Sequence, residues 1–309
     1  MNFYHMKAYT KLVCMLAMGC AIAAGTATSA YSTEKDNPER KETVMTAVRT
    51  AEVPKKMVFA GQTVDFSRED FYERMDREIV AFTFMHTNSV LALKRSGIYF
   101  PVVEPILKEM GLPDDLKYLM VIESNLDPTA KSSAGAAGLW QLMTATARSQ
   151  GLEVNSNIDE RYHVEKATRA ACKLLKSYYE EYGDWLTVAA AYNAGKNGID
   201  RRLAEQRQAS AADLWMTEET MRYMFRMMAA KMMFENPQAF GFDVPEKSRY
   251  SRKPPRETVT VTSTVKDLVD FAGQHGVSYA QLKRANLWLR ESSLQDESGR
   301  TYRVVIPAE

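Results

Sequence analysis

Apolar residues recur at helical spacing from Ser67 to about residue 235, with polar residues at the positions between them. The stretch SRED predicts a capping-box start at Ser67 for a helix that runs to Lys94, before Gly97 interrupts the pattern. A second helix is expected from Pro101 to Gly111, and Pro113 suits the first turn of a third. Further helices are predicted over residues 139–149, 164–182, 184–193 and 217–235. We find no strand pattern before about residue 257.

A different pattern begins at residue 257. VTVT alternates as a strand does, Thr264 with Asp267 and Ser278 with Gln281 predict two capped helices, and RVVIP predicts a closing strand. The preceding KSRYSRKPPR, residues 247–256, holds five positive charges, two prolines and no acid, and indicates a domain boundary. We interpret it as a solvated linker; the alternative is an anchor to an anionic cell wall.

The N-terminus has the pattern of an export signal. Lys7 and Lys11 precede LVCMLAMGCAIAAG, which is too short to span a membrane and is followed by the small residues TATSA. Cleavage near Ala30 would remove two lysines and no acid, lowering the formal charge from +1 to about −1. Neither value favours nucleic acid as a partner. The polar residues 31–55 are expected to form a tether.

Two of the three cysteines lie in this signal. Cys172 is therefore alone in the exported chain, which excludes an internal disulfide, and its helical context favours core packing over a reactive thiol. The residues before Cys20 loosely match a lipoprotein signal but lack the usual leucine three places earlier. Both a lipid anchor through Cys20 and simple secretion remain open.

Glu123 stands at the end of the apolar run YLMVIES. Leu116, Leu119 and Met120 precede it by seven, four and three residues, so on a helix its carboxylate continues an apolar stripe. An isolated charge there is costly. The periodicity leaves two interpretations open, a buried carboxylate satisfied by a structural partner and a functional acid.

Amide and aromatic residues follow at two further places. Gly135 and Gly138 precede a predicted helix whose first turns hold Gln141 and Met143, and Tyr192 with Asn193 follows an alanine run. Amides that bind hydroxyl and acetamido groups, with the nearby aromatic Trp140, would suit a sugar. The alternatives are that Tyr192 and Asn193 only end a helix and that Trp140 belongs to the core.

Metal and phosphate chemistry are poorly supported. The four histidines are scattered, and there is neither an HExxH motif nor a pair of cysteines at metal-ligand spacing. AGKNG lacks the first glycine and the final Ser or Thr of a phosphate loop. Methionines at 221, 224, 228 and 232 predict a helix core rather than a metal site. We therefore expect no cofactor.

The ordered combination of motifs resembles the soluble-lytic-transglycosylase-like (SLT) family of peptidoglycan-cleaving enzymes, nearest the membrane-bound lytic murein transglycosylase D type. The likeness runs from Tyr99 to Phe242 through YFPVVEPILKEMGLPDDLKYL, the ES pair at Glu123, SSAGAAGLWQLM, IDER, GDW, AYNAG and TMRY. Residues 257–309 more weakly resemble a LysM module. The resemblance implies a lysozyme-like helical catalytic domain over 56–245, a basic linker over 246–256, and a small β-α-α-β module that binds peptidoglycan in the periplasm or cell envelope.

The resemblance also implies residue roles. Glu123 would be catalytic, and substrate would be bound by Ser132, Gln141, Met143, Tyr192, Asn193 and Tyr223, with Tyr192 hydrogen-bonded to the catalytic carboxyl. This sequence has Thr144 and Phe225 at two positions where the family usually has proline, and His163 at a position where aspartate is common. None of these differences removes a group that the reaction needs.

We expect Glu123 to cleave the bond between N-acetylmuramic acid and N-acetylglucosamine as acid and then base, with the muramic acid C6 hydroxyl closing a 1,6-anhydro ring. Only one carboxylate is then needed, whereas ordinary glycosidases use two. Asp127, the nearest rival, precedes Pro128 and fits a turn better. The alternatives are a muramidase that admits water and a non-catalytic peptidoglycan-binding protein. Oligomeric state and regulatory partners are not indicated.

Overall fold

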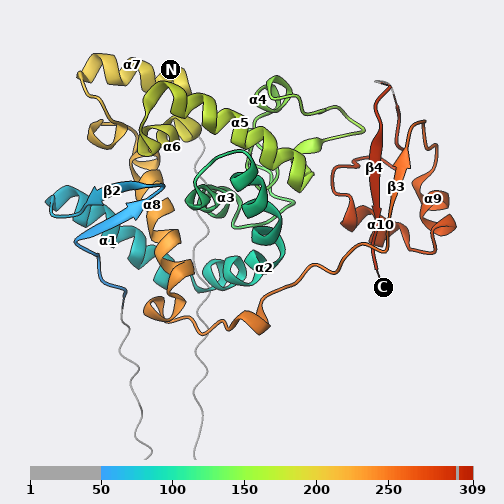
Figure 1. Ribbon diagram of the computed structural model, residues 1–309, viewed down its shortest axis with the longest axis horizontal. Coiled ribbons are helices and arrows are strands. Elements are labelled where there is room, and N and C mark those ends of the chain that lie inside the picture. Colours follow the sequence, from blue (N-terminus) through green and yellow to red (C-terminus); the bar gives the residue numbers. More distant parts are fainter. Residues whose placement is uncertain (1–49, 297–298, 309) are drawn as a thin grey trace, which may run out of the picture. The chain divides into compact units, whose positions relative to one another are not determined.

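The computed structural model describes residues 50–296 and 299–308 (Figure 1). The predicted signal over 1–30, Cys20 and most of the predicted tether lie outside these residues. The helices are α1 (Glu69–Phe84), α2 (His86–Glu109), α3 (Lys117–Ser124), α4 (Thr144–Ser149), α5 (Val164–Tyr182), α6 (Trp185–Ala194), α7 (Lys196–Gln206), α8 (Glu218–Glu235), α9 (Leu268–Gln274) and α10 (Tyr279–Ala285). The strands are β1 (Lys56–Phe59), β2 (Gln62–Asp65), β3 (Glu257–Val261) and β4 (Tyr302–Ile306).

Helices therefore dominate the described part of the chain before residue 257, and a β-α-α-β unit follows, as predicted. Short 3-10 helices lie between these elements, at Asp114–Leu116, Glu160–Tyr162, Ala211–Asp213, Pro237–Phe240 and Glu246–Ser248. In the residues that are described, no helix combines the length and the apolar character needed to cross a bilayer.

The expectation of no strand before residue 257 is wrong, because β1 and β2 pair as an antiparallel hairpin. Ala60 and Gly61 form its turn with φ of 51° and 82°, and positive φ at both central residues is the geometry of a tight hairpin turn. The predicted cap at Ser67 is also absent. The Ser67 backbone N–H donates to Asp65, ending the hairpin, and α1 begins at Glu69 without a side-chain cap.

The expected break at Gly97 is also wrong, since α2 continues through Gly97, Pro101 and Pro105. A Cβ at Gly97 would lie 2.3 Å from the Tyr250 carbonyl oxygen. The Tyr250 N–H donates to the Lys94 carbonyl at 2.8 Å, so the segment after α8 packs directly onto the backbone of α2. The glycine thus permits a close approach between two chain segments and does not end the helix.

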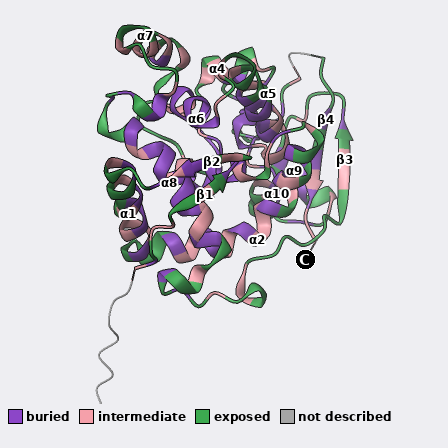
Figure 2. Cartoon of the chain, turned by 60° about the vertical axis from the view of Figure 1, so that its left-hand side comes forward, coloured by how far each residue is buried: buried purple, intermediate pink, exposed green. Residues whose placement is uncertain are grey.

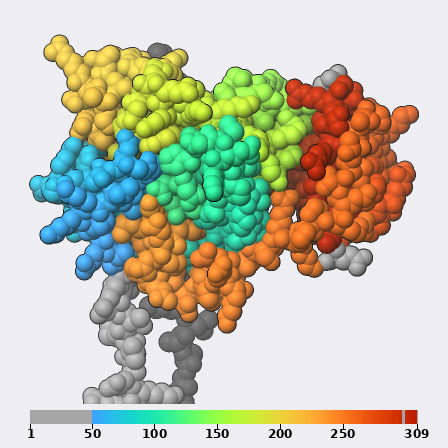
Figure 3. Space-filling model, viewed as in Figure 1, coloured from blue at the N-terminus to red at the C-terminus, as the bar shows by residue number. Residues whose placement is uncertain are grey.

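Helix α8 is the centre of the larger core. It packs against α1, α3 and α6, and Figure 3 shows the regions of α1, of α2 with α3, and of α8 adjoining at the surface. Met221, Met224 and Met228 are buried, and Met232 is partly buried, which confirms the predicted methionine core. Figure 2 shows α8 coloured largely as buried. Cys172 is also fully buried, and burial raises the pKa of its thiol to about 12. It is a core residue, as expected.

The C-terminal unit has its own core, which includes Leu268, Leu282 and Ile306. β3 and β4 pair antiparallel, and Ser278 with Gln281 forms the predicted capping box at α10. Asp267 alone caps α9; the Thr264 hydroxyl instead accepts from Asp296 N–H. Ala137, Ile158 and Tyr162 from the helical part complete this second core, so the C-terminal unit is packed against loops of the larger one.

Candidate active site

Glu123 lies in the last turn of α3 and lines a cavity of about 450 Å³. The backbone turns sharply after it, because Asn125 and Leu126 both adopt left-handed φ, at 52° and 55°. This conformation is unusual for leucine and costs about 1–3 kcal/mol when the surroundings impose it. Leu126 is fully buried and Arg95 donates to the Asn125 carbonyl, so packing holds the strained turn beside the carboxyl.

The Tyr223 hydroxyl, from α8, donates to Glu123 Oε1 at 2.5 Å. Burial of the Glu123 carboxyl, which disfavours its charged form, raises its pKa to about 7, with a smaller rise from the negative charge of Glu219. The Tyr223 hydrogen bond and the positive charge of Arg226 act in the opposite direction. Glu123 therefore holds its proton at near-neutral pH and can donate it, which general acid catalysis requires.

A second carboxylate, Glu78 of α1, lines the same cavity. It is fully buried, and its two oxygens accept from Arg222 Nε at 2.5 Å and Arg226 Nε at 3.1 Å. Both arginines come from α8, so the carboxylate joins two helices. Paired in this way, Glu78 is poorly placed to activate water or attack a sugar.

Sequence reasoning missed Glu78, although the signal was available. Phe71 and Met75 stand seven and three residues before Glu78, and Phe82 stands four residues after it. Glu78 therefore lies in an apolar stripe on its helix, as Glu123 does. The pattern alone does not distinguish the two glutamates. Their partners differ: a tyrosine hydroxyl for Glu123, and for Glu78 the guanidinium groups of Arg222 and Arg226, with that of Arg77 farther away at 3.8 Å.

The predicted helix over 139–149 starts only at Thr144. Gln141 has a left-handed φ of 46°, and its side-chain amide donates to the carbonyls of Ala130 and Gly138. Gly138 lies so close to Arg161 that a Cβ there would be 2.0 Å from the arginine's carbonyl oxygen. A tight turn held by these contacts therefore replaces the first helical turn.

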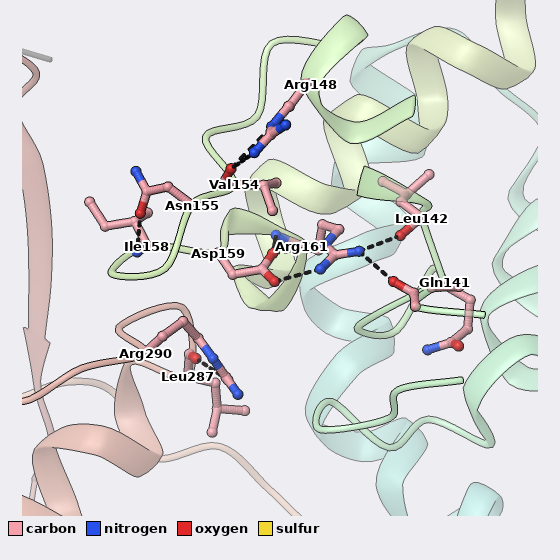
Figure 4. Close-up of polar contacts among 12 residues, drawn as sticks. Gln141, Leu142, Arg148, Val154, Asn155, Ile158, Asp159, Arg161, Leu287 and Arg290 are labelled. Atoms are coloured by element: carbon pink, nitrogen blue, oxygen red, sulfur yellow. Dashed lines mark hydrogen bonds and ion pairs between the residues drawn. The ribbon is translucent and has the colours of Figure 1, made fainter. Parts of the chain in front are cut away.

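Arg161 holds the outside of this turn. Its guanidinium pairs with Asp159 and donates to the Gly135 and Leu142 carbonyls at 2.7 and 3.1 Å, and Figure 4 shows it between Asp159 and Leu142. The loop that carries Gln141 is thus fixed by a buried ion pair.

Three of the predicted site residues, Glu123, Ser132 and Gln141, line the Glu123 cavity. Tyr223 reaches it through its hydrogen bond. The expected hydrogen bond from Tyr192 to Glu123 is not formed: the Tyr192 hydroxyl donates to the Trp140 carbonyl at 2.6 Å, and Tyr223 occupies that position instead. The sequence placed both tyrosines near the site but could not show which hydroxyl meets the acid.

The other predicted residues have structural contacts. Asn193 accepts from the Thr220 hydroxyl at 2.9 Å, which links α6 to α8, and Met143 is 44% exposed and does not line the cavity. Trp140 is fully buried and donates to Thr168, so it belongs to the core. Asp127 accepts from the backbone and the hydroxyl of Thr129, which confirms the predicted turn role.

Comparison with known proteins finds two matching family models. Residues 102–215 match the transglycosylase SLT domain, and residues 257–309 match the soluble lytic transglycosylase C-terminal LysM-like domain. The chain is 32% identical over 206 residues to membrane-bound lytic murein transglycosylase D of Escherichia coli strain K12, covering 65% of this chain and 44% of that protein. It is 39% identical over 88 residues to peptidoglycan transglycosylase gp16 of Escherichia phage T7, covering 28% and 7%.

The chain thus spans less than half the length of these curated relatives. Among solved structures, the 70 kDa soluble lytic transglycosylase of Escherichia coli matches with a TM-score of 0.42 and 20% identity, covering 60% of this chain and 39% of that one. The lytic transglycosylase Slt of Pseudomonas aeruginosa, as its E503Q variant, matches with a TM-score of 0.38 and 23% identity, covering 48% and 26%.

Proposed function

Since the chain carries an SLT domain followed by a LysM-like domain, we propose that it is a lytic transglycosylase of peptidoglycan. The bond cleaved is the β-1,4 bond from N-acetylmuramic acid to N-acetylglucosamine. The observation that carries the proposal is Glu123, whose pKa is raised to about 7 by burial and whose carboxyl accepts from Tyr223 at the wall of a cavity.

In the first step the protonated Glu123 donates to the glycosidic oxygen as its bond to muramic acid C1 breaks, and N-acetylglucosamine leaves with a free 4-hydroxyl. Glu123 is then a carboxylate, and Tyr223 stabilises that charge with its hydrogen bond. In the second step the carboxylate takes the proton of the muramic acid C6 hydroxyl, whose oxygen attacks C1. The ring closes, Glu123 regains its proton, and no water is consumed.

The state of Glu78 supports the transglycosylase over the muramidase. Hydrolytic glycosidases use a second carboxylate to attack the sugar or to activate water. The second carboxylate of this cavity is bound by Arg222 and Arg226 through both of its oxygens. The nucleophile is therefore assigned to the substrate.

Gln141 and Ser132 are the substrate-binding residues that the cavity supports best. The Gln141 amide nitrogen is already used by two backbone carbonyls, which leaves its oxygen to accept from a sugar hydroxyl or amide. The Ser132 hydroxyl accepts from Ala136 N–H and can donate its own proton to an acetamido oxygen. For Tyr192, Asn193 and Met143, none of which lines the cavity, substrate binding stays a prediction.

We place the protein in the periplasm or cell envelope, exported by residues 1–30 and either secreted or anchored by a lipid on Cys20. The support is the signal-like sequence and the relative named as membrane-bound. The proposed parts are the catalytic domain over 56–245, the linker over 246–256 and the LysM-like module over 257–309.

Mass spectrometry of the fragments released from purified peptidoglycan tests the function, with Glu123→Gln in parallel. Anhydro-muropeptides, lighter by one water than hydrolysis products and absent with the variant, are expected. Reducing-end fragments would identify a muramidase. If the protein sediments with peptidoglycan but releases nothing, it is a binding protein.

A further inference from the structure

A second and larger cavity, of about 840 Å³, lies away from Glu123. Three parts of the chain form its walls. The helical domain contributes Tyr99, Pro128 and residues 162–166, the segment before β3 contributes residues around Arg252, and the LysM-like unit contributes faces of α10 and β4. None of these residues takes part in the proposed chemistry.

The LysM-like unit presents regular faces to this cavity. Gln281, Arg284 and Ala285 are spaced as neighbours on one side of α10. Thr301 just before β4, and Arg303 and Val305 within it, alternate in sequence with Val304 and Ile306, which are buried in the core. Arg284 and Arg303 therefore line the cavity because each lies on the face of its element, α10 or β4, that is turned toward it.

The cavity is positively charged. Its lining holds five cationic side chains, and among the described residues Glu165 is its only acid. Glu165 already lies 3.2 Å from His163 and 3.6 Å from Arg252, and Lys166 pairs with the buried Glu160 outside the lining. Within residues 50–296 and 299–308, the side chains of Arg284 and Arg303 have no hydrogen-bonding or ionic partner. Two guanidinium groups are thus available for an anionic ligand.

Both cavities are lined from one loop. Ser124, Asn125 and Ala130 face the Glu123 cavity, whereas Pro128 faces the basic one. Two residues lie between Asn125 and Pro128, so three Cα–Cα steps join them and their Cα atoms lie at most about 11 Å apart. A group attached to a sugar bound at Glu123 can cross this distance, because a peptide of four or five residues reaches roughly 13–18 Å.

We propose that the basic cavity binds the peptide branch of peptidoglycan while the glycan strand occupies the Glu123 cavity. This rests on the proposed function. The branch is joined to muramic acid, carries free carboxylates that match Arg284 and Arg303, and has alanine methyl groups that can pack on Tyr99, Tyr162 and Trp288, which line the same cavity. The LysM-like unit would then bind the peptide as well as the glycan, and strands that carry peptides would be the preferred substrate.

The direct test is calorimetric titration of the full chain carrying Glu123→Gln. The ligands are a disaccharide-peptide and the same disaccharide freed of its peptide by an amidase. The peptide form is expected to bind at least about tenfold more tightly, and Arg284→Gln with Arg303→Gln is expected to remove this difference, because each charge-assisted hydrogen bond contributes about a factor of ten or more. Lys173→Gln with Lys176→Gln removes the same charge from the exposed surface of α5 and serves as the matched control. Equal affinity for both ligands overturns the proposal, as does an unchanged difference in the double arginine variant.

Cleavage kinetics separate this inference from the function on which it rests. In the protein that keeps Glu123, the two arginine substitutions are expected to raise KM for peptide-bearing strands about tenfold and to leave kcat little changed. Peptide-free strands should be cleaved as by the wild type. Cleavage of both substrates with one KM would overturn the peptide site and leave the transglycosylase in place. Absence of anhydro products from both would overturn the function, whereas the titration would still report on the cavity.

Discussion

At the scale of single residues, the two glutamates that line the cavity differ in their hydrogen-bonding partners. The fully buried Glu78 meets the guanidinium groups of Arg222 and Arg226, and the half-buried Glu123 meets a neutral hydroxyl. Burial also raises the pKa of Tyr223, so its hydroxyl keeps the proton that it donates. One cavity therefore holds a carboxylate fixed by arginines and a carboxyl able to exchange a proton near pH 7.

The pH dependence of cleavage follows from Glu123. The first step needs the protonated acid, so kcat/KM is expected to fall as pH rises through about 7. Tyr223→Phe removes a hydrogen bond that lowers the pKa of Glu123, and the falling limb should move to higher pH. The measurement is the pH profile of anhydro-product release. A limb that stays in place would show that Glu123 is not the titrating group.

Stability should depend on the same proton. Folding raises the pKa of Glu123 from 4.5 to about 7, so the protonated carboxyl stabilises the folded state relative to the ionised one. This stabilisation is complete below pH 4.5 and is lost as pH rises through 7. Glu123→Gln cannot ionise, and it should gain up to about 3 kcal/mol relative to wild type at pH 8, with little gain at pH 5. Denaturant unfolding at both pH values measures this. The exposed Glu180→Gln is the control, and an equal effect of Glu123→Gln at both pH values contradicts the prediction.

At the scale of elements, local patterns predicted α5, α6, α8 and the capped α10, because each has an apolar face or a side-chain cap within its own sequence. These local patterns gave the wrong backbone conformation where contacts with residues distant in the sequence determine it. Gln141 adopts a left-handed turn because the Ala130 and Gly138 carbonyls take its amide hydrogens, and Gly97 stays helical because Tyr250 packs against it. The sequence likewise singled out Glu123 as a candidate acid but assigned it Tyr192 as partner where the structure has Tyr223, since that choice depends on how α8 packs against α3.

Gly97 offers a test at this scale. A methyl group there would overlap the Tyr250 carbonyl oxygen, so Gly97→Ala should destabilise the protein by about 1–3 kcal/mol despite the better helix propensity of alanine. Gly273→Ala in α9 is the matched control, because nothing lies within 4 Å of its added Cβ, and it should stabilise by about 0.5–1 kcal/mol. Denaturant unfolding measures both variants. If the two changes have the same sign, the packing explanation at Gly97 is wrong.

At the scale of the described chain, the LysM-like unit joins the helical domain through backbone groups as well as apolar contacts. Asn157 is the central residue: its side chain donates to the Ser293 carbonyl and accepts from Gln295 N–H, and its carbonyl accepts from Arg290 N–H. Asp159 N–H donates to the Trp288 carbonyl, and Tyr302 donates to Glu153. These bonds hold in place the LysM-like wall of the basic cavity.

Asn157→Ala should therefore loosen this junction without affecting Glu123. It leaves the Gln295 N–H and the Ser293 carbonyl without their partner, which costs about 1–3 kcal/mol if they remain buried. Protease cleavage in the exposed linker at residues 251–256 is expected to become faster, by up to the roughly 5- to 150-fold change in the opening equilibrium that this cost corresponds to, while peptide-free strands are cleaved at the wild-type rate. Asn197→Ala on the exposed surface of α7 should change neither readout. Unchanged proteolysis in Asn157→Ala would mean that the apolar contacts alone hold the two units together, and the peptide preference should then survive the substitution as well.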